Sequence, residues 1–194
     1  MSEIWVNLGV VLLFVLVGGF FSAAELALVS VRESQVARLA ENSKRGRTLA
    51  GLTKDPNRFL ATVQVGVTLA GFISAGFGAA TIAPEIAVPL ENIGLSAAAA
   101  NTVAFIGITV IIAYISLVLG ELVPKRIALQ RVEQVALFVA GPIEFTSKIT
   151  RPFIVALSGS TNVIVRLFGI DPKAVKEQMS GEELRDLVAA HEDL

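Results

Sequence analysis

The sequence has no cysteine, a single histidine and few charged residues. Without cysteine, the chain cannot form disulfides, thiolate metal sites or a cysteine nucleophile. The one histidine, His191, cannot build a histidine cluster, and its polar surroundings predict a solvated residue. Charged residues make up 17% of the 194 residues, well below the roughly 25% of ordinary soluble domains. The composition therefore argues against a typical soluble domain.

Excess positive charge is also missing. The formal net charge is −1, so the chain lacks the basic surface that neutralises a phosphate backbone, and we expect no nucleic-acid partner. Catalytic motifs are equally scarce. The sequence contains no paired nucleophile and base, no glycine-rich phosphate loop and no HExxH motif, so we do not expect an enzyme.

Long apolar runs dominate what is present. Hydrophobic residues form 54% of the chain, and the mean hydropathy is +0.70. The runs cover about residues 4–31, 59–83 and 97–119. Each can cross a bilayer core of about 30 Å at ~1.5 Å per residue. We therefore predict an all-α integral membrane protein whose residues 1–134 form a domain of three transmembrane helices.

The distribution of lysine and arginine predicts the orientation of these spans. The segment between the first and second spans is rich in both residues, from Arg32 to Arg58, whereas Pro84 to Ser96 contains neither. The positive-inside rule places the basic segment in the cytoplasm. We therefore expect the N-terminus outside, the C-terminus in the cytoplasm, and a cell-membrane location, in a bacterial or archaeal inner membrane.

Two segments follow the third span. Residues 135–169 are apolar, but Pro142, Pro152 and interspersed charges divide them into pieces too short to cross a bilayer. Amphipathic juxtamembrane helices are therefore predicted there. Residues 170–194 are acidic, and Ser180 with Glu183 has capping-box spacing, which predicts a soluble helix. No Gly or Pro closes that helix, so we expect a longer protein with a further C-terminal regulatory region.

Polar residues within the first two spans are candidates for a cavity. Ser22 and Glu25 share one face of the first span, and ionisable residues in membranes by default face the bundle interior. The alternative for Glu25 is a position at the interface near Arg32. In the second span, Thr62, Gln64 and Thr68 could line the same cavity.

Small residues recur at four-residue steps on both helices. On the second span they are Gly66, Ala70, Ser74 and Gly78, and on the first span they are Gly19, Ala23 and Ala27. Such stripes let helix backbones approach closely. We expect the first span to pack against the second, with a dimer face as a further use of the stripe.

The third span ends in Gly120-Glu121-Leu122-Val123-Pro124-Lys125. Pro124 has no N–H for the carbonyl of Gly120, so the helix should be interrupted there. The Glu121 carboxylate then lies beside a free backbone oxygen, and hard cations such as Mg²⁺ prefer oxygen ligands. The alternative is an ion pair between Glu121 and Lys125 at i, i+4.

Three motifs in this order resemble the transmembrane domain of the cyclin M (CNNM)/CorC family, also called haemolysin-C-like. They are Phe21 to Leu28, Gln64 to Leu69 and Gly120 to Lys125. The resemblance covers roughly residues 1–170. It implies a homodimer in the lipid bilayer that exports Mg²⁺ coupled to Na⁺. It also implies that nucleotide-binding CBS modules, absent from this chain, follow in the full-length protein.

The resemblance further implies a metal site made by Ser22, Thr62, Glu121 and the Gly120 carbonyl. Glu25, Gln64, Thr68, Pro124 and Lys125 are additional candidates for the cavity. One departure concerns the asparagines that many family members carry in the second span, because this chain has Val67 and Gly71 there. The identity of the ion therefore stays open. A polyamine exporter and a non-transporting membrane anchor or regulator are the alternatives.

Overall fold

The computed structural model describes residues 2–169, which are helical with short turns and contain no strand in that range. Helical stretches long and apolar enough to span a membrane cover Glu3–Ser30, Pro56–Asn92 and Ala97–Gln130. This confirms the predicted class, an all-α membrane protein with three spans. The predicted acidic helix at 170–194, with His191, lies outside the described residues.

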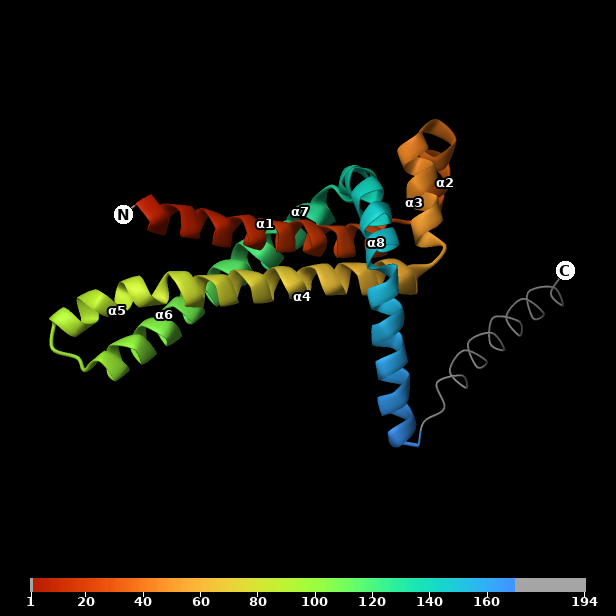
Figure 1. The fold of residues 1–194 in the computed structure, drawn as a ribbon. Coiled ribbons are helices and arrows are strands. Elements are labelled where there is room, and N and C mark those ends of the chain that lie inside the picture. The colour runs from red at the N-terminus through yellow and green to blue at the C-terminus, as the bar shows by residue number, and fades with distance from the viewer. Residues whose placement is uncertain (1, 170–194) are drawn as a thin grey trace, which may run out of the picture. The chain divides into compact units, whose positions relative to one another are not determined.

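The three spans are built on α1 (Ser2–Ser30), α4 (Pro56–Thr81) and α6 (Ala97–Leu117). Capping residues define two of the starts: the Asp55 side chain accepts a hydrogen bond from the Arg58 N–H, and Ser96 accepts one from Ala99. α1 lies beside α4 in Figure 1, as the small-residue stripes predicted.

The segment that joins the second and third spans is helical over most of its length. α5 (Ala83–Asn92) is a helix that continues the second span with only a short turn between. Pro84 lies in its first turn, where its missing N–H needs no partner. The proline therefore ends one helix and starts another.

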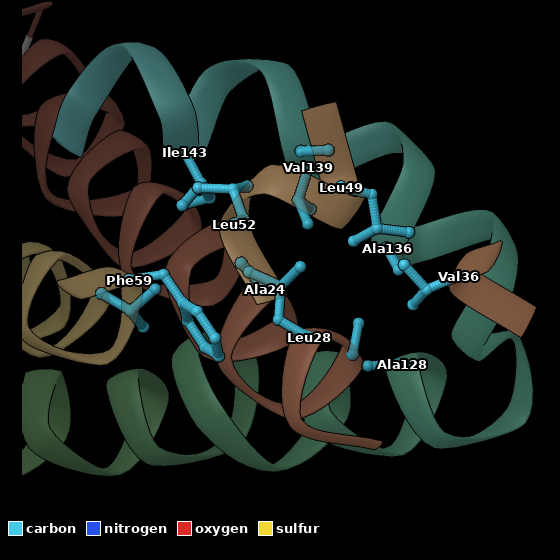
Figure 2. Packing of buried hydrophobic residues seen from close by; sticks show 13 residues of the cluster. Ala24, Leu28, Val36, Leu49, Leu52, Phe59, Ala128, Ala136, Val139 and Ile143 are labelled. Atoms are coloured by element: carbon cyan, nitrogen blue, oxygen red, sulfur yellow. The ribbon is translucent and has the colours of Figure 1, made fainter. Parts of the chain in front are cut away.

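At the other end of the spans, α2 (Glu33–Asn42), α3 (Lys44–Thr53) and the first part of α8 form a small apolar core with α1. Figure 2 shows Leu49, Val139 and Ile143 of this core near Ala24 and Leu28 of α1. The Arg38 guanidinium donates to both carboxylate oxygens of Glu133, at 2.7 and 2.8 Å. This core ties the basic segment to the base of the spanning helices.

The prediction of several short juxtamembrane helices is wrong about their number. α8 runs without a break over Val132–Leu167. Each proline removes one backbone hydrogen bond, but its fixed φ is already helical, so the helix continues through Pro142 and Pro152. α8 is not among the candidate spans in the described residues. The chain divides at Ile149 and Thr150 into two compact units, and the described part of the second is the mostly exposed end of α8.

Candidate cation site

The third span is interrupted at the motif that the sequence singled out. After α6, residues Val118–Leu122 form a π-helix, η1, and α7 (Val123–Gln130) follows. The Val123 N–H donates to the carbonyl of Val118, five residues back. Pro124 has no N–H to offer Gly120, so the α-helical pattern cannot continue unchanged. Short π-helices of this kind are frequent at functional sites.

Helix α1 approaches this interruption backbone to backbone. A Cβ on Gly19 would lie 2.9 Å from the Leu119 carbonyl oxygen and 3.0 Å from Pro124 Cγ. A Cβ on Gly120 would lie 3.3 Å from the Val15 carbonyl oxygen. All three distances are tighter than ordinary contacts, so the approach depends on the missing side chains. The carbonyl oxygens of Leu119 and Val15 therefore both lie at this contact.

Ser22 lies three residues beyond Gly19 on α1 and is fully buried. Its Oγ has no hydrogen-bond partner within the described part of the chain. A buried polar group without a partner costs about 1–3 kcal/mol, and such groups in native structures call for an explanation. A buried hydroxyl without a partner, one turn along α1 from Gly19, is a candidate ligand for a cation.

Helix α4 also packs against α1. A Cβ on Gly66 would collide with the Phe21 ring, at 2.6 Å, and Gly18 faces Ala70. Thr62 lies one turn before Gly66, is fully buried, and donates its hydroxyl to the Arg58 carbonyl at 2.9 Å. The donated proton leaves the lone pairs of the Thr62 oxygen available as a ligand.

Gly19 of α1 does not face the helix that was predicted for it. Gly19 was expected to pack against the second span, but it faces the third, at Leu119 and Pro124. The neighbouring Gly18 faces the second span instead. The sequence signal was the Gly18-Gly19 pair, because two adjacent residues without side chains can face two different helices.

Glu121 is half-buried and has no ion pair or hydrogen bond with any residue in 2–169. Lys125 pairs with Glu25 across α1 and α7, with Nζ and Oε2 3.5 Å apart. The alternative in which Glu121 pairs with Lys125 is therefore not observed. The pairing leaves the Glu121 carboxylate available to a ligand.

The remaining candidates lie elsewhere. Gln64 and Thr68 are exposed on α4, whereas Thr62 faces the packed interior. No group of three or more His, Asp or Glu side chains gathers as a metal cluster in the described residues. The candidate ligands are therefore one carboxylate, two hydroxyl groups and backbone carbonyls.

The chain matches one family model and several known proteins. Residues 8–193 match the model of the family described as "Cyclin M transmembrane N-terminal domain". UPF0053 protein sll0260 of Synechocystis sp. is 37% identical over 96% of this chain and 42% of its own length. UPF0053 protein YugS of Bacillus subtilis is 34% identical over 92% and 42%.

A further relative is named "Polyamine export protein", from Haemophilus influenzae, and is 29% identical over 97% of this chain and 43% of its own length. The chain thus spans about two fifths of the length of these relatives. A match to the family model over nearly the whole chain, which has three candidate spans, identifies the family. The chain belongs to the cyclin M transmembrane N-terminal domain family.

Proposed function

We propose that this membrane protein exports a small cation, with Mg²⁺ as its substrate and Na⁺ as the coupling ion. The observation that carries the proposal is the unpaired, fully buried Oγ of Ser22. It lies one turn from the contact between Gly19 and the Leu119 carbonyl. An oxygen without a hydrogen-bond partner is stabilised when it coordinates a cation.

The chemistry of the nearby groups favours a hard cation. Glu121 offers a carboxylate, and Ser22 and Thr62 offer hydroxyl groups. The Gly120 carbonyl lacks its usual hydrogen-bond donor, because Pro124 has no N–H. Mg²⁺ prefers six oxygens and gives up water reluctantly. The ion would therefore keep part of its hydration shell, which suits a site with a single carboxylate.

Export of a polyamine is the second candidate, because the Haemophilus influenzae relative bears that name. A polyamine carries several ammonium groups and binds best where carboxylates are spaced along its length. Here the second nearby carboxylate, Glu25, already holds the ammonium of Lys125. This favours the metal ion. A non-transporting anchor is the third candidate and predicts no flux of either substrate.

The proposal includes a homodimer in a cell membrane, with the N-terminus outside and CBS modules following in the full-length protein. Gln64 and Thr68 are exposed one turn apart on α4. Polar side chains are unfavourable against lipid, so this face suits a second copy of the chain.

Flux measurements test the site directly. The chain would be reconstituted into liposomes loaded with a Mg²⁺-sensitive dye, under an opposing Na⁺ gradient. We expect Glu121→Gln to reduce Mg²⁺ flux at least about tenfold, because ligand bonds to a charged group are the strong ones. Glu91→Gln is the matched control, since Glu91 is exposed at the end of α5, and it should behave as the parent chain.

The same liposomes separate the three candidates. Spermidine flux that exceeds Mg²⁺ flux and requires Glu121 would replace Mg²⁺ with a polyamine as the substrate. If neither substrate moves under any gradient, the anchor interpretation takes the place of transport.

A further inference from the structure

A cavity of about 450 Å³ lies away from the cation site, at the basic end of the spans. It is bordered by α3, the start of α4 and the first part of α8, all within the first compact unit. Its charged lining residues are Lys44, Arg47, Asp55, Arg58, Glu144 and Lys148. The cation site uses none of them.

The two acidic residues of this cavity are already engaged. Glu144 pairs with Lys148 on α8 at 2.8 Å, and the Asp55 carboxylate caps α4 by accepting the Arg58 N–H. Lys44 and Arg47 have no acidic partner within residues 2–169. The cavity therefore has an excess of uncompensated positive charge, which favours the binding of an anion.

The side chain of Arg58 is held in a fixed position in this cavity. Its Nε donates to the Oγ of Ser147 at 2.8 Å, and Ser147 is buried. Among the described residues, the two Nη groups have no hydrogen-bond partner. Arginine presents these groups as a rigid planar fork that matches phosphate oxygens. The bond to Ser147 fixes the guanidinium before any ligand arrives, so less rotamer freedom is lost on binding.

Apolar side chains complete the cavity. Leu52 and Phe59 belong both to its wall and to the apolar core below it. Arg58 lies in the first turn of the spanning helix α4, close to where a bilayer would present its headgroups. Basic pockets between helices at a membrane surface are typical binding places for anionic lipid headgroups.

We propose that this cavity binds the phosphate of an anionic phospholipid from the leaflet on the basic side of the protein. Arg47 and Arg58 contact the phosphate, Lys44 adds charge, and Leu52 and Phe59 face the start of the acyl chains. The bound lipid joins α3, α4 and α8 at the base of the spans. This proposal is independent of which cation the protein moves.

Native mass spectrometry of the chain released from nanodiscs tests the proposal. The nanodiscs would contain phosphatidylcholine with phosphatidylglycerol. We expect the parent chain to retain phosphatidylglycerol in preference to phosphatidylcholine. Arg47→Gln and Arg58→Gln should each weaken that retention by about tenfold, because each removes charge-assisted hydrogen bonds. Arg45→Gln is the matched control, since Arg45 is exposed on the same helix as Arg47 but does not line the cavity.

A second pair of variants covers the case in which loss of Arg58 disturbs folding. Gly51 lines the cavity, and a Cβ there would meet nothing within 4 Å. Gly51→Asp adds a carboxylate without removing a contact, and it should reduce retention of phosphatidylglycerol while Gly51→Ala retains it.

Inorganic phosphate distinguishes a lipid headgroup from a free phosphate. If millimolar inorganic phosphate binds the parent chain and displaces phosphatidylglycerol completely, the cavity is a site for soluble phosphate and the lipid proposal is overturned. It is also overturned if the cavity variants and Arg45→Gln retain phosphatidylglycerol equally, or if phosphatidylcholine is retained as well.

Discussion

Two buried serines on neighbouring helices differ in one respect. Ser22 and Ser74 are both fully buried. Ser74 donates to the Val11 carbonyl at 3.4 Å, whereas Ser22 has no partner in the described part of the chain. Packing alone would favour alanine over serine at position 22, since a buried hydroxyl without a partner lowers stability. The hydroxyl at this position therefore fits a role in binding rather than in folding.

We predict opposite effects when these serines are replaced. Ser22→Ala removes an unpaired polar group, so the thermal unfolding midpoint in detergent should stay the same or rise. Ser74→Ala removes a hydrogen bond of about 0.5–1.5 kcal/mol, and its midpoint should fall. In the liposome assay, Ser22→Ala should lose Mg²⁺ flux while Ser74→Ala keeps it. A clear drop in the midpoint for Ser22→Ala would mean that the hydroxyl is structural.

At the scale of elements, the sequence predicted the spans well because apolar length and capping residues act locally. The expected second start near Phe59 lies within three residues of Pro56, where Asp55 caps the helix. Whether a given proline ends a helix was harder to predict. Pro84 lies in the first turn of one helix, and Pro142 and Pro152 lie inside another, so the missing N–H alone does not determine where a helix ends.

The candidate site was predicted as a set of residues but not as an arrangement. Ser22, Thr62 and Gly120 are buried, and their role as ligands stays a prediction. The partner of Lys125 could not be predicted, because spacing within one helix favoured Glu121 while the actual partner, Glu25, lies on α1. Interactions between helices depend on rotation about each axis, which periodicity alone does not determine.

The close approach of α1 to η1 predicts the effect of a substitution at Gly19. Gly19→Ala places a methyl group 2.9 Å from the Leu119 oxygen, and backbone on both sides cannot yield easily. We expect a loss of about 1–3 kcal/mol in stability together with loss of flux. Gly9→Ala on the same helix is the control, because a Cβ at Gly9 meets nothing within 4 Å. Equal melting midpoints for the two variants would contradict the tight contact.

At the scale of the whole molecule, one end of the spans is strongly basic and the other is not. Arg32 to Arg58 separates the first two spans, while Ala83 to Ser96 joins the second and third without a lysine or arginine. Both the proposed lipid site and the predicted orientation follow from this asymmetry.

The orientation can be measured without background, because the chain has no cysteine. We expect Ile93→Cys to react with a membrane-impermeant maleimide on intact cells. Arg45→Cys should react only after the membrane is permeabilised. Both positions are exposed, so accessibility within the protein is matched. The reverse pattern would place the basic end outside.

The π-helix η1 also determines how α7 is rotated about its axis relative to α6. A π turn takes about one more residue than an α turn, so the residues that follow are set back by about 100° around the axis and about 1.5 Å along it relative to an unbroken α-helix. With this offset Ala128 of α7 is buried in the core beside Ala24 and Leu28, and Lys125 reaches Glu25. An unbroken helix would turn both residues away from α1. The same five residues that present Glu121 therefore also align the base of the third span with the first.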